Sequence, residues 1–350
     1  MNYLSFPGLG IGPFQINDTA FTVFGLDIKW YGIIITVGMI LAYFYARTRA
    51  KYEGITEDDL YEVTISCVIF GVIGARLYYV LFKLKDFIVT DGSLWDNIKN
   101  SFIAIVNIRN GGLAIYGGLL AGVLTLLIFA KIKRIHFPVL LDVAAPAAMI
   151  GQIVGRWGNF INIEAYGRAT VVPWRMSSRV IAEELFNKRQ INYEAYSQII
   201  DGSLGVHPTF LYESVWNLIG FALIAVFYKK KRFNGQVCLF YGAWYGLGRA
   251  MIEGLRTDSL MLGSIRVSQL LAGMLFVLCT FLFVYFTVKT PEILKLMPVD
   301  GKDAENSGAT DETDGDHEDE SDADSAEIET ESKPEIDSET EGENENGEAD

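Results

Sequence analysis

Residues 137–167 read FPVLLDVAAPAAMIGQIVGRWGNFINIEAYG, and they hold the most information about the fold. Residues 137–160 are mainly apolar and long enough for a helix that crosses a bilayer, which needs about 20 residues. Arg156, Asn159, Asn162 and Glu164 then follow within nine positions. A charged side chain in lipid costs roughly 2.5–3.5 kcal/mol on insertion scales, so it usually faces a cavity or a partner. The stretch therefore predicts a membrane-spanning helix whose end belongs to a functional site.

The rest of the chain has the composition of a membrane protein. Its 350 residues are 50% hydrophobic and 13% aromatic, with a mean hydropathy of +0.24. Seven apolar stretches have the length of membrane helices, at residues 30–46, 63–82, 112–130, 137–160, 211–228, 236–255 and 265–288. Their length favours helices over the ten-residue alternation of barrel strands. We expect an all-α polytopic membrane protein with about seven transmembrane helices.

Charge is distributed unevenly along the chain. The formal charge is −14, but the acidic excess lies in the last 50 residues. Residues 299–350 have few apolar side chains, so we expect a disordered acidic tail. Residues 1–298 form the predicted membrane domain, and residues 162–210 are its predicted extracytoplasmic segment.

Basic residues predict the orientation in the membrane. Tight clusters occur at span ends: Arg47-Thr48-Arg49-Ala50-Lys51, Lys131-Ile132-Lys133-Arg134 and Lys229-Lys230-Lys231-Arg232. Such clusters in short loops favour the cytoplasmic side. The N-terminus is then outside and the C-terminus cytoplasmic. Residues 1–29 lack the basic n-region of a cleaved signal peptide, so the first span should remain as an anchor.

Cysteines and histidines give no sign of a metal or cofactor. Cys67, Cys238 and Cys279 lie within predicted spans and are interpreted as small buried residues. The three histidines are scattered. We expect no metal and no cofactor.

Two groups of charged residues are candidates for a site. Arg156 and Asn159 are spaced i, i+3 and would share one helix face, where a guanidinium can bind a phosphate through two hydrogen bonds. Alternatively, Arg156 extends to the interface and Asn159 caps the helix. Arg249, Glu253 and Arg256 also share one face, either as a ligand site with net positive charge or as a purely structural ion-pair ladder.

The motif Gly-Arg-x-Gly-Asn-Phe-Ile-Asn-x-Glu-x-x-Gly at residues 155–167, followed by Arg168, resembles the signature of the prolipoprotein diacylglyceryl transferases. Further matches occur in the family's order over about 260 residues. They are Trp30-Tyr31-Gly32, Gly71-Val72-Ile73-Gly74-Ala75-Arg76, Arg109-Asn110-Gly111-Gly112-Leu113, Tyr116-Gly117-Gly118, His207-Pro208-Thr209 and Leu211-Tyr212-Glu213. Members of this family are bacterial membrane enzymes. The resemblance implies transfer of diacylglyceryl from phosphatidylglycerol to the thiol of a preprotein's lipobox cysteine, forming a thioether and releasing glycerol phosphate.

The resemblance also implies roles for individual residues. Arg156 and Arg249 would bind the lipid phosphate, and Asn159 and Tyr31 would position the head group. Glu164 and Glu253 would orient these donors or accept a proton. Gly167 would allow close backbone approach, and Arg76 and Arg256 would add substrate contacts.

Two positions depart from the family's pattern. Tyr116 stands where many members have a histidine, and a phenol with a reference pKa near 10 is a poor base at neutral pH. Tyr116 would then hydrogen-bond to the lipid or substrate, or another group takes the thiol proton. Phe210 replaces a common glutamine, which affects only a local polar contact.

Two other classes of protein compete with a transferase. A transporter or channel for an anionic solute could use the same intramembrane arginines, but it predicts internal repeats that the sequence does not display. A structural membrane protein with an acidic arm would leave the motif unexplained.

Overall fold

The computed structural model describes residues 2–88, 92–108, 111–257, 261–262 and 265–296. The chain divides into two units after Leu296. The predicted tail, 299–350, and the motif residues Arg109 and Asn110 lie outside the described residues. The helices are α1 (Trp30–Tyr52), α2 (Glu57–Phe82), α3 (Leu94–Val106), α4 (Ile115–Lys133), α5 (Phe137–Ile161), α6 (Arg179–Asn187), α7 (Tyr193–Asp201), α8 (Thr209–Phe227), α9 (Gln236–Glu253) and α10 (Val267–Leu296).

All seven predicted stretches are helical, and within the described part of the chain six helices are long and apolar enough to cross a membrane. These six begin at Trp30, Glu57, Ile115, Phe137, Thr209 and Val267. The protein is therefore a multi-pass membrane protein, as predicted. The seventh stretch forms α9, which is not one of the six. It is 18 residues long and carries Arg249 and Glu253, and it packs against α10, α5 and α8.

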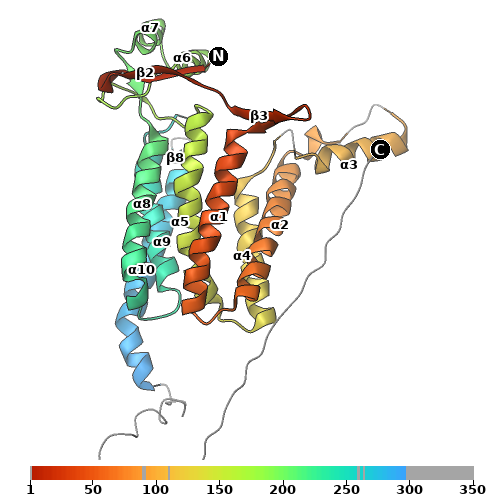
Figure 1. The fold of residues 1–350 in the computed structure, drawn as a ribbon, viewed down its shortest axis with the longest axis vertical. Coiled ribbons are helices and arrows are strands. Elements are labelled where there is room, and N and C mark those ends of the chain that lie inside the picture. Colours follow the sequence, from red (N-terminus) through yellow and green to blue (C-terminus); the bar gives the residue numbers. More distant parts are fainter. Residues whose placement is uncertain (1, 89–91, 109–110, 258–260, 263–264, 297–350) are drawn as a thin grey trace, which may run out of the picture. The chain divides into compact units, whose positions relative to one another are not determined.

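Short strands cover one end of the bundle, where none was predicted (Figure 1). The strands are β1 (Asn2–Phe6), β2 (Ile11–Ile16), β3 (Thr19–Val23), β4 (Leu26–Lys29), β5 (Ala169–Thr170), β6 (Gly205–Val206), β7 (Met261–Leu262) and β8 (Ile265–Arg266), paired as four antiparallel two-stranded sheets. Strand β1 joins the 162–210 segment through two backbone hydrogen bonds of 2.9 Å between Ser5 and Ser177. Leu4, Met176, Ile181 and Ile199 are buried in the core that these segments share.

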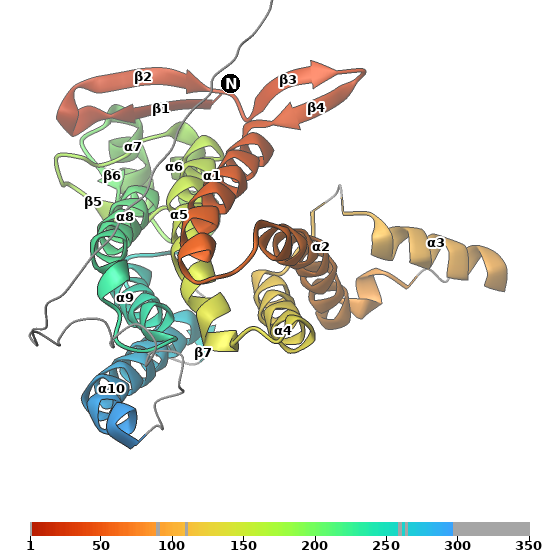
Figure 2. The same cartoon turned by 60° about the horizontal axis from the view of Figure 1, so that its bottom comes forward.

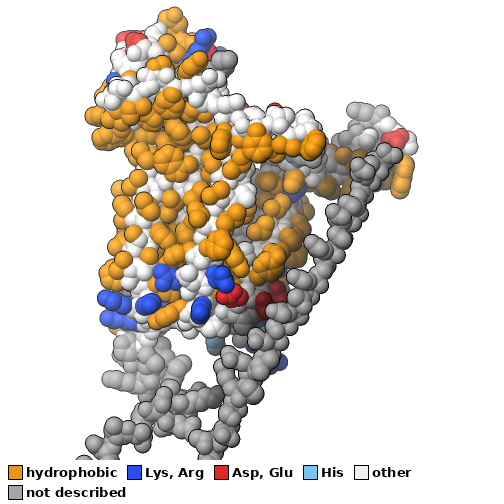
Figure 3. Space-filling view, viewed as in Figure 1, with side chains coloured by type: hydrophobic (Ala, Val, Ile, Leu, Met, Phe, Trp, Pro, Cys, Tyr) orange, Lys and Arg blue, Asp and Glu red, His pale blue; other side chains and the backbone are white. Residues whose placement is uncertain are grey.

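The helices pack in pairs, with α2 against α4 and α1 against α5, and α5 also contacts α8 (Figure 2). Glycines allow the contact between α2 and α4: a Cβ on Gly74 would lie 2.8 Å from the carbonyl oxygen of Gly117. Basic side chains gather at the end of the bundle away from the strands (Figure 3). There Lys231 bridges two buried carboxylates, with Nζ 2.8 Å from Glu53 and 3.1 Å from Asp142. Asp142 also accepts hydrogen bonds from the backbone N–H groups of Gly235 and Cys238 at the start of α9.

A tryptophan pair joins α8 to α9. The rings of Trp216 and Trp244 stack with centroids 4.5 Å apart, and each Nε1–H donates to the other residue's carbonyl oxygen at 2.9 Å. Each ring lies over a glycine of the opposite helix: Trp216 covers Gly248 and Trp244 covers Gly220. The two glycines therefore let the helices approach closely enough for both hydrogen bonds.

Gly248→Ala should destabilise the protein, because the new Cβ would overlap the Trp216 indole. Overpacking of this kind costs typically 1–3 kcal/mol. We expect a lower melting temperature in detergent and a weaker near-UV circular dichroism signal from the stacked indoles. Gly273→Ala is the matched control, since a Cβ there meets nothing within 4 Å. Equal melting temperatures for the two variants would contradict the role of the tryptophan pair.

Candidate active site

The motif on α5 forms the outer end of the site. Arg156 and Asn159 share a face of α5, and Arg156 Nη1 lies 3.5 Å from Asn159 Oδ1. The helix ends at Ile161, and the chain reverses through Ile163 and Ala165, which have φ angles of 52° and 57°. For a β-branched residue such as Ile163, a positive φ is strained, and strained backbone often occurs at functional sites.

This reversal directs Glu164 back toward the end of α5. Its Oε1 accepts hydrogen bonds from Asn159 Nδ2 at 2.8 Å and from Asn162 Nδ2 at 3.2 Å. Asn159 thus links Arg156 to Glu164 and does not cap the helix. The sequence predicted the proximity of these residues, and the structure adds the turn that creates it.

Glu213 of α8 occupies the centre of the site, although the sequence analysis gave it no role there. Its side chain is only 4% exposed. Oε2 lies 2.5 Å from Arg156 Nη2, and Oε1 lies 3.0 Å from Arg249 Nη1 and 3.5 Å from Arg256 Nη1. One signal could have identified it: an acid inside an apolar span needs a cation, and α8 carries none.

The second predicted set lies beside Glu213. Arg249 Nη2 is 2.7 Å from Glu253 Oε2, and Arg256 Nε is 3.9 Å from the same oxygen. Glu253 therefore pairs with both arginines, as their spacing predicts. Arg156, Arg249, Arg256, Glu213 and Glu253 form the arginine cluster, in which three guanidiniums face two carboxylates. The excess positive charge suits an anionic ligand.

Two tyrosines named as site residues lie at the border of the cluster. The Tyr31 ring packs on α5, where a Cβ on Gly158 would lie 2.6 Å from it. Tyr116 is in the first turn of α4 and is half exposed. Tyr245 of α9, which the sequence analysis did not name as a site residue, interacts electrostatically with Arg156, Arg249, Glu213 and Tyr116.

Gly167 is packed against protein backbone. Its N–H donates to the carbonyl oxygen of His207 at 2.8 Å, and the next N–H, of Arg168, donates to Leu255 at 2.8 Å. A Cβ on Gly167 would lie 2.7 Å from the His207 Cβ and 3.1 Å from the Leu255 oxygen. Gly167 therefore allows the motif to pack closely against the backbone at His207 and Leu255. Because Leu255 precedes Arg256, this contact connects the motif to Arg256.

His207 is held beside this contact. Its Nδ1 lies 3.0 Å from the hydroxyl of Tyr212, which accepts a hydrogen bond from Trp174 Nε1 at 2.6 Å. Burial lowers the pKa of His207 below its ordinary value. The imidazole is therefore neutral at pH 7, and its Nδ1 can accept a hydrogen bond from the Tyr212 hydroxyl.

Arg76 is corrected from a substrate-binding residue to a structural one. Its guanidinium makes five hydrogen bonds of 2.7–2.9 Å, all to backbone carbonyls: Ala104, Ile105, Asn107, Gly111 and Gly112. Three of these carbonyls belong to the C-terminal end of α3, which attracts positive charge. With every N–H donor already used, Arg76 has none to offer a phosphate.

An apolar cavity of about 480 Å³ lies between α1, α2, α4, α5 and α9. Alanines and glycines such as Ala145, Ala148 and Gly122 line it, together with Tyr241. Tyr241 accepts a hydrogen bond from Gln152 Nε2 at 2.8 Å, one helical turn from Arg156. Gln152 thus lies between the wall of this cavity and Arg156 along α5. In the described part of the chain, no three His, Cys, Asp or Glu side chains are grouped as a metal site would require.

Fold and site together define a multi-pass membrane protein with a positively charged cluster among its helices and an apolar cavity farther along α5. Residues 18–285 match the family model described as prolipoprotein diacylglyceryl transferase. The chain belongs to this family, in agreement with the resemblance found in its motifs.

Curated relatives agree with the family match. A protein of Finegoldia magna is 42% identical over 258 residues, which cover 73% of this chain and 90% of the relative. One of Clostridioides difficile is 42% identical over 257 residues, with the same coverage, and one of Listeria innocua is 39% identical over 281 residues, covering 80% and 94%. Each is named phosphatidylglycerol–prolipoprotein diacylglyceryl transferase. These matches give no support to the transporter alternative.

Proposed function

We propose that this protein transfers the diacylglyceryl group of phosphatidylglycerol to the thiol of a lipobox cysteine in a bacterial prolipoprotein. The sulfur forms a C–S thioether bond to the glyceryl carbon, the C–O bond to the phosphate breaks, and glycerol phosphate leaves with the bonding electrons. The observation that carries the proposal is the arginine cluster, in which three guanidiniums are held by two buried carboxylates, in a member of this family.

The cluster suits the departure of a phosphate. Arg156 and Arg249 would bind the phosphate oxygens, where negative charge grows as the C–O bond breaks. Glu213 and Glu253 hold these guanidiniums in place before the substrate arrives. Such preorganised donors stabilise the transition state without moving during the reaction. Arg256 adds positive charge from the same side, and the cavity along α5 would hold the acyl chains.

The remaining residues would position the head group and the thiol. Tyr31 and Tyr116 border the cluster and would hydrogen-bond to the lipid or the peptide. Within the described part of the chain, Glu164 accepts hydrogen bonds from the neutral amides of Asn159 and Asn162, whereas Glu213 and Glu253 are paired with arginines. We assign Glu164 as the group that accepts or relays the thiol proton, and Gly167 as the residue that allows the motif to pack beside Arg256.

We place the protein in the bacterial cell membrane with its N-terminus outside and its C-terminus cytoplasmic. The basic clusters support this orientation, because Arg47 and Lys133 lie near the C-terminal ends of α1 and α4, and Lys231 pairs with Glu53, the residue after α1. Basic side chains gather at the end of the bundle away from the strands (Figure 3). The 162–210 segment then lies outside, where secreted preproteins carry their lipobox.

Reconstitution with phosphatidylglycerol and a lipobox peptide tests the proposal. Mass spectrometry should detect a diacylglyceryl adduct on the peptide cysteine, and a Cys→Ser peptide should give none. Asn159→Ala should lower the rate roughly tenfold to a hundredfold, because it frees both Arg156 and Glu164 from their positions. A folded wild-type protein that forms no adduct would contradict the proposed reaction.

A further inference from the structure

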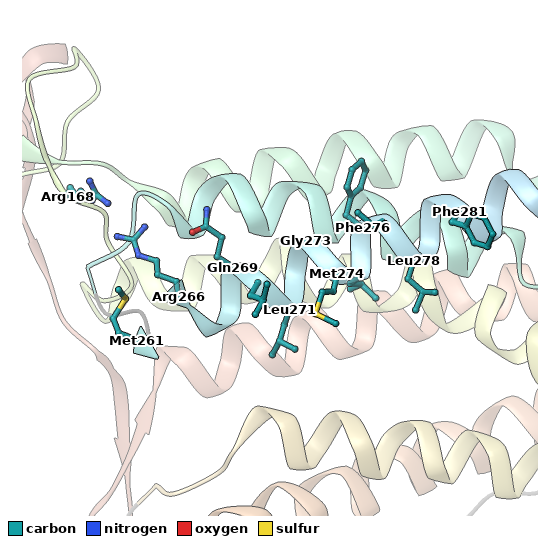
Figure 4. A pocket seen from close by; sticks show the side chains of 13 residues that line it. Arg168, Met261, Arg266, Gln269, Leu271, Gly273, Met274, Phe276, Leu278 and Phe281 are labelled. Carbon is teal, nitrogen blue, oxygen red and sulfur yellow. The ribbon is translucent and has the colours of Figure 1, made fainter. Parts of the chain in front are cut away.

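A long groove runs along α10 (Figure 4), and no residue of the arginine cluster is among the described residues that line it. It has a volume of about 1480 Å³, larger than the roughly 300–1,000 Å³ of an ordinary small-molecule pocket. Its wall is apolar and includes Leu271, Met274, Leu278 and Phe281. The backbone of α10 also packs against α9, where the carbonyl oxygen of Ala272 and the backbone of Phe276 contact Gly246.

Two arginines stand at one end of this α10 groove. In Figure 4, Arg168 and Arg266 lie together at the end nearest the strands, and the apolar side chains extend away from them. Arg266 Nη1 donates to the carbonyl oxygens of Glu253 at 3.2 Å and Gly254 at 2.6 Å, which fixes its position. The backbone of Arg168 is fixed by hydrogen bonds with Leu255 and His207, while its side chain remains exposed. No Asp or Glu is among the described residues that line the groove.

The length of the groove matches one leaflet of a membrane. From Gln269 to Phe281, a helical rise of 1.5 Å per residue gives about 18 Å. Half of a bilayer's hydrocarbon core is about 15 Å. A lipid whose phosphate lies at the arginines would thus extend its acyl chains along the groove to the middle of the membrane.

We propose that the α10 groove binds an anionic phospholipid, with the phosphate between Arg168 and Arg266. This site is distinct from the arginine cluster, because Arg168 and Arg266 are absent from its ion pairs. It is nevertheless adjacent, since Arg168 donates to Leu255, the residue before Arg256. The choice of phosphatidylglycerol as the test lipid rests on the proposed function, whereas the site itself is inferred from the groove and its two arginines.

Photo-crosslinking from position 274 tests the site directly. A photoreactive residue replaces Met274 in the full-length protein, held in nanodiscs of phosphatidylcholine with phosphatidylglycerol as the minor lipid. Each of the two arginines should attract anionic lipid by about 1 kcal/mol, so phosphatidylglycerol should be labelled about thirtyfold above its share of the lipid. Labelling in proportion to the lipid mixture would overturn the proposal.

Two variants test the two parts of the proposed site, the arginines and the apolar groove, and each has a control variant. Arg168→Gln should remove most of the enrichment, whereas Arg179→Gln, at an exposed ion pair on α6, should leave it unchanged. Gly273→Phe should fill the groove without a clash, because a Cβ at this position meets nothing within 4 Å. Val284→Phe is the control, since it places the same side chain on α10 outside the groove. Enrichment that persists in both Arg168→Gln and Gly273→Phe would contradict the proposed site.

An arginine of the cluster separates this proposal from the proposed reaction. Arg249→Gln should abolish transfer and leave the enrichment at position 274 intact. Loss of enrichment in this variant would mean that the labelled lipid binds at the arginine cluster. That result would overturn the proposal that the α10 groove is a separate site. A wild-type protein that lacks transferase activity but enriches phosphatidylglycerol would contradict the proposed function alone.

Discussion

Glu213→Gln is expected to lower both the melting temperature and the transfer rate. Glu213 is buried and faces Arg156, Arg249 and Arg256 at 2.5–3.5 Å. Removing one partner of a buried ion pair typically costs 3–5 kcal/mol, because the remaining charge stays buried without compensation. Here three guanidiniums would be left with Glu253 alone. We expect a melting temperature about 10 °C lower in detergent and a rate reduced by roughly 10²–10³.

An exposed pair provides the control for this experiment. Glu183→Gln also removes a carboxylate from an arginine, but both side chains of the Arg179–Glu183 pair are exposed. Exposed pairs contribute about 0–1 kcal/mol, so this variant should behave as the wild type. Glu213→Gln with an unchanged melting temperature would contradict the central position of Glu213.

A double variant separates charge balance from geometry. Combining Glu213→Gln with Arg256→Gln restores the original excess of one positive charge in the cluster. Part of the lost stability should return, because fewer buried charges repel one another. The transfer rate should stay low, since nothing then holds Arg156 and Arg249 in position. Full recovery of the rate would show that Glu213 acts only as a counter-charge.

Local patterns account for the parts of the fold that the sequence predicted. An apolar run of about 20 residues specifies a membrane helix without reference to the rest of the chain. All seven stretches therefore appear as helices, and only the polar α9 falls outside the set of candidate spans. The N-terminal strands were missed because they are only four to six residues long and pair as local hairpins, β1 with β2 and β3 with β4, which a search for apolar runs of membrane length does not detect.

In the site, too, contacts within one helix could be predicted from spacing, whereas contacts between different helices could not. Arg249, Glu253 and Arg256 lie within two turns of α9 and its end, so their spacing alone predicts their contacts. Glu213 contacts arginines that come from α5 and from α9 and its end, and no spacing within α8 reveals those partners. Arg76 was misassigned because its partners are backbone carbonyls, which every residue possesses.

Arg156→Lys is expected to reduce kcat by about 10²–10³ while the protein remains folded. The guanidinium of Arg156 contacts Glu213 through Nη2 and approaches Asn159 through Nη1, so two directions are fixed at once. A lysine keeps the charge beside Glu213 but loses the planar fork that can bind a phosphate through two hydrogen bonds. Because the lost interaction strengthens as charge develops on the phosphate, kcat should fall more than KM changes.

Arg47→Lys is the matched control for the loss of a guanidinium. Arg47 pairs with Glu57 at the exposed end of α1, far along the helix from Tyr31, and its side chain is 47% exposed. Its replacement should leave kcat and the melting temperature near those of the wild type. Wild-type turnover in Arg156→Lys would restrict Arg156 to holding Glu213, and the phosphate would then depend on Arg249. A melting temperature as low as that of Glu213→Gln would mean instead that the loss of activity follows from a disrupted cluster.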